Sequence, residues 1–295
     1  MRICVIFNPA ARGNKARHFR RHLDGIGGQS AFKATAAPGD ARRLATEAIA
    51  DGFDLIVAAG GDGTMNEVLN GIGDAPNGFE RVSLGVLPLG TMNVFARELK
   101  IPLRIEHAWE VLRRGREIKI DLGCAEFSAG GVLKKQFFAQ LAGAGLDARA
   151  IELVDFSAKK KIGPLAYVAA GLKALSERKP KICVDAGGRN FSGELVLIGS
   201  GKFYGGPFTI FPSADLSDGL LDVCIFPRVD FPMLFRCAPN FLARRKLPEK
   251  AVRRFRAEKF ELASDSAAAF ELDGEWVGNL PVTFSAGRKK LRVVC

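Results

Sequence analysis

The feature that most constrains this chain is an apolar run that ends in consecutive glycines. Residues Asp54 to Gly71 read DLIVAAGGDGTMNEVLNG, so a short β-forming segment stops at Gly-Gly-Asp-Gly and a helical pattern follows. Two other apolar runs, at 3–7 and 84–90, also end in polar or glycine-containing loops ahead of helical segments. Uniformly apolar strands separated by helices predict an α/β domain whose parallel sheet is covered by helices on both faces.

The glycines after the second of these strands are typical of a phosphate site. Gly60, Gly61 and Gly63 let the backbone approach phosphate oxygens, and the free amides and the dipole of the next helix supply positive potential. Thr64 and Glu67 match the pattern S/T-x-x-E, which predicts a helix that starts at Thr64 with a capping box. A tight turn with an ordinary cap explains the same residues, because short glycine motifs are common.

Asp62 favours the phosphate interpretation over the simple turn. A carboxylate repels a phosphate unless a cation bridges them, and Mg²⁺ held by a carboxylate and phosphate oxygens is such a bridge. The carboxyl ends of parallel strands meet at one edge of a sheet, where ligands bind. The other residues that we expect to contact a nucleotide there are Asn8, Pro9, Arg12 and Lys15 after the first strand, and Gly90, Thr91 and Asn93 after the third.

The length of 295 residues predicts two domains, and the texture of the sequence changes after about Asp121. Short β-forming runs punctuated by Gly, Asp and Asn follow, with one helical pattern at 164–175. We therefore expect an α/β nucleotide-binding domain at 1–122 and a mainly antiparallel, sandwich-like β domain at 123–282. The last apolar run predicts a strand at about 283–295 that returns to the first domain.

The net charge of +11 indicates an anionic partner. Between Arg228 and Lys259 there are ten Lys and Arg against three acids, a net charge of +7. Apolar residues among these charges favour peripheral contact with an anionic membrane, although a solvated helical face has the same pattern. Nucleic acid fits less well, because no reader motif is present. The apolar anchors are Phe231, Met233, Leu234, Phe235, Phe241, Leu242 and Phe255.

The sequence has no apolar run as long as a membrane-spanning helix and no signal-peptide core, so we expect a cytoplasmic protein. The six cysteines never form C-x-x-C, which predicts free thiols. Residues 143–148 match the loose pattern G-x-G-x-x-A, but no βαβ context follows, so a structural turn is the better interpretation.

These motifs resemble the diacylglycerol kinase catalytic superfamily, and more narrowly the bacterial soluble lipid kinases related to sphingosine kinases. One departure is Met92 and Val94, where the family has a small residue and an Asp, so any role of a carboxylate at 94 is lost. NAD kinases and phosphofructokinases share the GGDG loop, but their TGSTAY-like and TIDND-like segments are absent. The matching segments are VAAGGDGTMNEVLNG, LGVLPLGTMNVFAREL, the Asn8 loop, IDLG at 120–123, AGAGLDA at 142–148, SADLSDGLLDV at 213–223 and ELDGEW at 271–276.

The resemblance implies an ATP-dependent and magnesium-dependent lipid kinase, with the lipid hydroxyl entering a cleft between the domains. It implies that Asp273 is the general base with Glu275 assisting, and that Asp121 joins Asp62 in the network of Mg²⁺ and water. Glu271, Asp273 and Glu275 alternate and could share one face, but by spacing alone Asp-Gly favours a turn between strands. Asp121 could likewise be an ordinary strand-end residue.

The resemblance also implies a structural Mg²⁺ held by Asp215, Asp218 and the Leu220 carbonyl, although a solvated turn at Asp218-Gly219 explains the same residues. Two other functions stay open: a non-catalytic regulator that binds a nucleotide or lipid, and a kinase of a soluble metabolite, as in NAD kinases. The sequence leaves open which lipid accepts the phosphate and whether the protein forms a homodimer.

Overall fold

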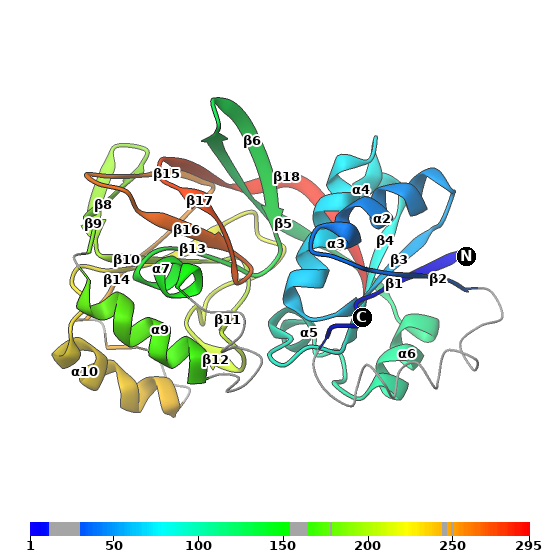
Figure 1. Ribbon diagram of the computed structural model, residues 1–295, viewed down its shortest axis with the longest axis horizontal. Helices are drawn as coiled ribbons and strands as arrows, with labels where there is room; N and C mark the ends of the chain where they lie inside the picture. The colour runs from blue at the N-terminus through cyan, green and yellow to red at the C-terminus, as the bar shows by residue number, and fades with distance from the viewer. Residues whose placement is uncertain (12–29, 154–164, 178, 244–246, 249–250) are drawn as a thin grey trace. The chain divides into compact units, whose positions relative to one another are not determined.

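A computed structural model describes residues 1–11, 30–153, 165–177, 179–243, 247–248 and 251–295. The chain divides into two compact units (Figure 1). The first unit comprises Met1–Leu122, Gly205–Pro207 and Gly287–Cys295, and the second comprises Gly123–Tyr204 and Phe208–Ala286. No helix in these described ranges is both long enough and apolar enough to cross a membrane.

The sheet of the first unit is parallel, as the apolar runs predict. Its strands lie in the order β2-β1-β3-β4, and every neighbouring pair is parallel. The last strand, β18, adds to this sheet by pairing Arg292 and Val293 with Ser83 and Leu84 of β4. The strand bounds are β1 Ile3–Phe7, β2 Ser30–Ala34, β3 Leu55–Gly60, β4 Ser83–Pro88 and β18 Val282–Val294.

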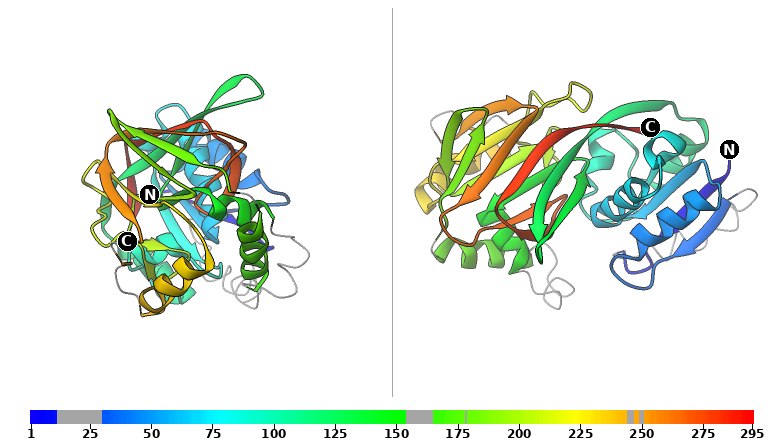
Figure 2. Two further views of the ribbon diagram at one scale, coloured as in Figure 1. Left: turned by 90° about the vertical axis from the view of Figure 1, so that its left-hand side faces the viewer. Right: turned by 90° about the horizontal axis from the view of Figure 1, so that it is seen from above.

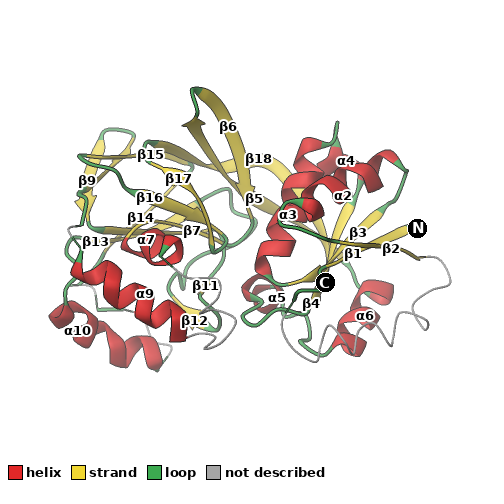
Figure 3. Cartoon of the chain, viewed as in Figure 1, coloured by secondary structure: helices red, strands yellow, loops and turns green. Residues whose placement is uncertain are grey.

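Helices pack on this sheet, with α3 and α6 drawn on opposite sides of β3 and β4 (Figures 1 and 3). Helix α2 buries Ala41, Leu44, Ala45, Ala48 and Ile49, and it packs mainly against α3. Asp40 is the first residue of α2, and its carboxylate accepts the amides of Ala36 and Ala37 in the preceding turn. The bounds are α2 Asp40–Ala50, α3 Asp62–Asp74, α4 Gly78–Arg81, α5 Val94–Glu98 and α6 Ile105–Arg114.

The second unit is a sandwich of antiparallel strands, as predicted. One sheet has the order β14-β13-β10-β7-β16-β17, and the facing strands are β18-β15-β8-β9 with the hairpin β5-β6. Their bounds are β5 Glu117–Ala129, β6 Val132–Phe138, β7 Leu141–Gly145, β8 Ile182–Ala186, β9 Arg189–Gly193, β10 Leu195–Gly199, β13 Leu221–Phe226, β14 Arg253–Ala257, β15 Lys259–Ser264, β16 Ala269–Leu272 and β17 Glu275–Asn279. A short pair, β11 Phe203–Tyr204 and β12 Phe208–Thr209, lies outside both.

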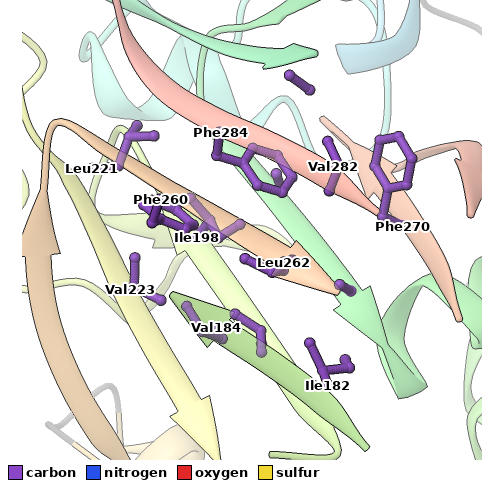
Figure 4. Packing of buried hydrophobic residues seen from close by; sticks show 14 of the residues in the cluster. Ile182, Val184, Ile198, Leu221, Val223, Phe260, Leu262, Phe270, Val282 and Phe284 are labelled. Atoms are coloured by element: carbon purple, nitrogen blue, oxygen red, sulfur yellow. The ribbon is translucent and has the colours of Figure 1, made fainter. Parts of the chain in front are cut away.

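The core of the sandwich packs phenylalanine rings among aliphatic side chains (Figure 4). Phe284 contacts both Phe260 and Phe270, with ring centroids 5.7 Å and 6.3 Å away. The opposite face of the six-stranded sheet is covered by helices α9 (Leu165–Ser176) and α10 (Phe231–Leu242), which bury residues such as Leu175 and Met233 there (Figures 1 and 2). This arrangement buries both faces of β7, β10, β13 and β16, whereas the edge strands β14 and β17 stay largely exposed.

Candidate functional site

Three loops of the first unit converge because they follow neighbouring parallel strands. The Asn8 amide donates to the Ala59 carbonyl at 3.0 Å, which ties the end of β1 to the end of β3. The amides of Leu89 and Gly90 both donate to the Gly60 carbonyl, at 2.9 Å and 3.1 Å, which ties the end of β4 to β3. The loops after β1, β3 and β4 therefore form one connected edge, which we call the strand-end edge.

Glycines let these loops approach closely. A Cβ atom on Gly90 would lie 2.5 Å from the Cα of Gly61, so only glycine permits this contact between two backbones. A Cβ atom on Gly60 would collide with the side chain of Thr64. Helix α3 begins directly after Gly61 and runs for 13 residues, so its unpaired first amides lie at the same edge. This is the backbone arrangement that suits an anion.

The capping box predicted from Thr64 and Glu67 is wrong. Helix α3 begins at Asp62, two residues earlier, and its N-cap Gly61 has an extended backbone and no side-chain cap. The Thr64 hydroxyl instead accepts from Asn8 Nδ2 at 3.1 Å, which links the first two loops. The Glu67 carboxylate accepts the amides of Gly39 and Ala41 at 2.9 Å and 3.0 Å, so it anchors the start of α2.

Asp62 and Asn93 connect the starts of two helices. Asp62 Oδ1 accepts the amide of Phe95 at 3.3 Å, at the beginning of α5. Asn93 is buried, has a left-handed backbone with φ of 48°, and donates from Nδ2 to the Gly90 carbonyl at 2.8 Å. Thr91, between Gly90 and Asn93 in the sequence, is exposed. Asp62 thus stands at the strand-end edge, where its carboxylate is the kind of ligand that Mg²⁺ prefers.

Asp121 lies on β5 with its side chain only 10% exposed, and Lys290 Nζ is 2.8 Å from its Oδ1. This lysine already neutralises the carboxylate, so a metal–water network would have to share Asp121 with Lys290. Pro9 is partly exposed beside Asn8. Arg12 and Lys15, which we also expect at the nucleotide, lie outside the described residues.

In the second unit, Asp273 and Gly274 form the two-residue turn of the β16–β17 hairpin. Both have left-handed backbones, with φ of 49° and 86°, which is the conformation that such a hairpin turn requires. The expectation that three alternate acids share one face is wrong, because the turn reverses the chain between them. Glu271 is fully buried on β16, whereas Glu275 is exposed on β17.

The Asp273 carboxylate is held by a row of backbone amides. Ala139, Gln140 and Leu141 each donate their amide to it at 3.0 Å, and the Asp273 amide donates to the Leu141 carbonyl at 2.8 Å. The residue is 6% exposed. Hydrogen bonds of this kind fix the orientation of the carboxylate.

The acids of the 213–223 segment already have a positively charged partner. Arg256 forms ion pairs with Asp218 and, at 3.0 Å, with Asp222. The other Asp218 oxygen accepts the Leu220 amide at 3.0 Å, and Asp215 accepts both the amide and the hydroxyl of Ser217. Since a guanidinium occupies the loop, these residues do not fit a metal as they stand. The structural Mg²⁺ at Asp215, Asp218 and Leu220 stays a prediction.

Asp147, on α7 (Leu146–Glu152), was not singled out within the matching segment 142–148, and Glu271 was noted only for its spacing. Strand β7 runs directly into α7, so the G-x-G-x-x-A segment is a strand-to-helix junction rather than a simple turn. Asp147 Oδ2 and Glu271 Oε1 are buried without a hydrogen-bond partner in the described part of the chain. Periodicity cannot reveal such a pair, because it forms between α7 and β16.

The basic segment at 228–259 presents an apolar helix face. On α10, Phe231, Leu234 and Phe235 are 57%, 40% and 78% exposed. Met233 and Phe255, predicted as anchors of the same kind, are buried in the core instead. The side chains of Phe241 and Leu242 lie outside those described. We call Phe231, Leu234 and Phe235 the α10 face.

Comparisons with known proteins agree across both units. Residues 2–125 match the diacylglycerol kinase catalytic domain, and residues 140–295 match the YegS C-terminal NAD kinase beta sandwich-like domain. A diacylglycerol kinase of Bacillus subtilis is 31% identical over 98% of this chain and 95% of its own. One from Staphylococcus aureus is 30% identical over 95% of this chain and 88% of its own.

Solved structures show the same fold. A crystal structure of a diacylglycerol kinase from Bacillus anthracis has a TM-score of 0.72 and 19% identity, and covers 99% of this chain and 96% of its own. A second structure from that organism has a TM-score of 0.78 and 22% identity over 99% of this chain and 97% of its own. With both family domains matched in order, the chain belongs to the diacylglycerol kinase family.

Proposed function

We propose that this protein transfers the γ-phosphate of ATP to a hydroxyl group of diacylglycerol or a related lipid, with the help of Mg²⁺. The observation that carries the proposal is the strand-end edge, where the loops after β1, β3 and β4 meet beside the start of α3. Family membership supports a lipid kinase. The nucleotide, the metal and the acceptor lipid are the parts that we add.

At the strand-end edge, the backbone of the 60–64 loop and the amino end of α3 would hold the phosphates, with Asn8, Gly90 and Asn93 fixing the shape of the loops. Because Asp62 stands among these amides, it is the residue that would hold Mg²⁺, and Asp121 would contact the metal through water. Bound there, Mg²⁺ would neutralise the charge of the transferring phosphoryl group. The protein's own contribution is orientation, because its loops are fixed by the hydrogen bonds already described.

Asp273 would take the proton of the acceptor hydroxyl. Its carboxylate is held in one orientation by the amides of residues 139–141, which suits a group that must meet a hydroxyl in one geometry. General base catalysis contributes about 10²–10⁴ in rate. Glu275, exposed on the other side of the turn, would assist as a nearby negative charge.

A kinase of this kind must reach a lipid that is in a bilayer. The α10 face offers three exposed apolar side chains in a segment whose sequence carries a net charge of +7. Apolar side chains that enter the interface, with basic residues attracted to anionic headgroups, are the two signals that together give stable peripheral binding. We propose that this face contacts an anionic membrane.

The test is transfer of label from γ-labelled ATP to lipid vesicles that contain diacylglycerol, phosphatidylglycerol, a sphingoid base or a prenol. The wild type should give one labelled lipid. The Asp273→Asn and Asp62→Asn variants should give at least about 10²-fold less, while Glu261→Gln, an exposed residue on β15, should match the wild type.

Other outcomes would overturn the proposal in distinct ways. Label that appears only in a soluble metabolite such as NAD would show a metabolite kinase. Binding of ATP without any labelled product would show a non-catalytic regulator. Full activity in Asp273→Asn would remove Asp273 as the base.

A further inference from the structure

Two buried acids converge on one point beside the Asp273 turn. Gly143 of β7 lies between them, and a Cβ atom at this glycine would be 2.8 Å from Asp147 Oδ2 and 2.9 Å from Glu271 Oε1. Glu271 is 0% exposed, and neither of these two oxygens has a hydrogen-bond partner among the described residues. Gly143 thus leaves the space in which the two carboxyl groups meet.

The second oxygen of Glu271 holds the turn itself. Glu271 Oε2 accepts the amide of Gly274 at 2.6 Å. Gly274 directly follows Asp273, so this hydrogen bond closes the loop that carries the proposed base. A carboxyl group that lost its position here would release Gly274 and, with it, the turn.

Two ionised carboxylates cannot remain side by side in a buried site, because burial and mutual repulsion both disfavour the second charge. Burial raises the pKa of Asp147 to about 6. Burial, and next the charge of Asp147, raise the pKa of Glu271 well above its usual value. Both pKa values are raised, so the buried pair favours holding one proton between its two carboxyl groups rather than ionising completely.

The titratable groups that face Glu271 also disfavour its ionisation. They are Asp147 on α7, Asp273 in the turn, Glu275 on β17 and the hydroxyl of Tyr204. None of these carries a positive charge. Tyr204 is hydrogen-bonded to Asp147, which lowers the pKa of Asp147 in opposition to burial. Arg149 of α7 forms ion pairs with Glu152 and Glu177.

We propose that Glu271 is a positioning residue for the Asp273–Gly274 turn and that it works by sharing one proton with Asp147. Protonated Glu271 donates from Oε1 toward Asp147 Oδ2 and accepts the Gly274 amide at Oε2. Only a proton moves between the two carboxyl groups, so the step needs no further reactant. Loss of the proton would place two negative charges beside Gly143 and push the turn away from the 139–141 amides.

Three substitutions separate this role from simple packing. Glu271→Gln keeps an acceptor for Gly274 and a donor for Asp147, Glu271→Leu removes both, and Asp147→Asn removes the shared charge. The Glu261→Gln variant on β15, an exposed site of the same unit, is the matched control. Infrared spectra at neutral pH should show a protonated carboxyl group in the wild type and in Glu261→Gln, and none in Glu271→Gln.

The conformation of the turn is followed by the NMR chemical shift of the Gly274 amide in ¹⁵N-labelled protein. It should stay near its wild-type position in Glu271→Gln and move in Glu271→Leu. A protonated carboxyl signal that persists in Glu271→Gln, or equal Gly274 shifts in both variants, would overturn the proposal. These measurements need no substrate, so they decide it even if the proposed function fails.

The catalytic consequence rests on the proposed function. Glu271→Gln should lose much less kcat at neutral pH than Glu271→Leu, because it keeps both hydrogen bonds. Glu271→Leu should lose about 10²-fold in kcat, the order expected for a misplaced catalytic group, with an unchanged KM for ATP. A loss in Glu271→Gln as large as that in Glu271→Leu would contradict positioning through a shared proton.

Discussion

Arg256 forms ion pairs with two acids of the second unit, Asp218 and Asp222. Asp222 is 9% exposed, and burial raises the pKa of its carboxyl group against the opposing effect of Arg256. Removing the guanidinium leaves a largely buried carboxylate without a partner. We expect Arg256→Met to lower the free energy of unfolding by about 1–3 kcal/mol, measured by denaturant unfolding at pH 7.

The control is Arg253→Met on the same strand, where the arginine is exposed, and its effect should be small. The deficit of Arg256→Met should narrow as the pH is lowered, because protonation discharges Asp222. The Mg²⁺ prediction for this loop can be tested in the same way. If added Mg²⁺ stabilised the wild type, but not a variant with both Asp215 and Asp218 changed to Asn, a metal would bind the loop in addition to Arg256.

Asp147 gives a pH prediction with a defined window. Its pKa is raised in the folded state from 3.8 to about 6, so the folded protein binds a proton that the unfolded chain releases. Stability therefore falls as the pH rises from about 4 to 6. In Asp147→Asn this part of the pH dependence should disappear from the unfolding free energy. An unchanged profile would show that Asp147 is not protonated in the folded state.

The residues of the site differ in how far the sequence reveals them. Asp273 was assigned a role by resemblance alone, while spacing predicted only its Asp-Gly turn, which the structure confirms. That three amides of residues 139–141 hold its carboxylate was out of reach, because they are more than a hundred positions away. Glu271 and Asp147 matter through their meeting at Gly143, which only tertiary packing creates.

Among the elements, the contact between the loops after β3 and β4 is the tightest backbone approach at the strand-end edge. A Cβ at Gly90 would meet the backbone of Gly61, which cannot move aside as a flexible side chain could. We expect Gly90→Ala to destabilise the first unit by about 1–3 kcal/mol and to weaken ATP binding, measured by thermal unfolding and calorimetry.

Gly171 of α9 provides the contrast, since nothing lies within 4 Å of a Cβ there. Gly171→Ala should be neutral or stabilise the protein by up to about 1 kcal/mol, because alanine favours a helix. A Gly90→Ala variant that is as stable as the wild type and binds ATP equally well would contradict the close approach.

Apolar runs predicted β1, β3, β4 and the helices after them, because buried parallel strands must be apolar on both faces. The start of α3 was misplaced, since Thr64 and Glu67 satisfy the capping-box pattern yet bond to Asn8 and to α2. Strand β2 was missed because its residues are only partly buried and carry no apolar pattern. The predicted helix after the first strand lies outside the described residues.

For the molecule as a whole, the α10 face makes a prediction about membranes. Phe231→Ser with Phe235→Ser should reduce sedimentation with anionic phosphatidylglycerol vesicles at least about tenfold, because two apolar side chains no longer enter the interface. Activity on a short-chain lipid dispersed as monomers should stay unchanged. Wild-type binding should also weaken as salt is raised.

The control uses a second exposed apolar site in the same unit. Val132 and Leu133, at the β5–β6 hairpin, are 61% and 77% exposed. Val132→Ser with Leu133→Ser should sediment like the wild type. Equal losses in both pairs would mean that exposed apolar area in general, rather than the α10 face, drives the binding.

Strand β18 also has a consequence for how the protein is made. Arg292 and Val293 pair with β4, although β4 is translated some two hundred codons earlier. A nascent chain therefore carries an unpaired β4 edge until residues 292 and 293 have been made, and unpaired strand edges can pair with other chains. A chain truncated before Arg292 should therefore leave this edge of β4 unpaired and aggregate rather than stay in solution.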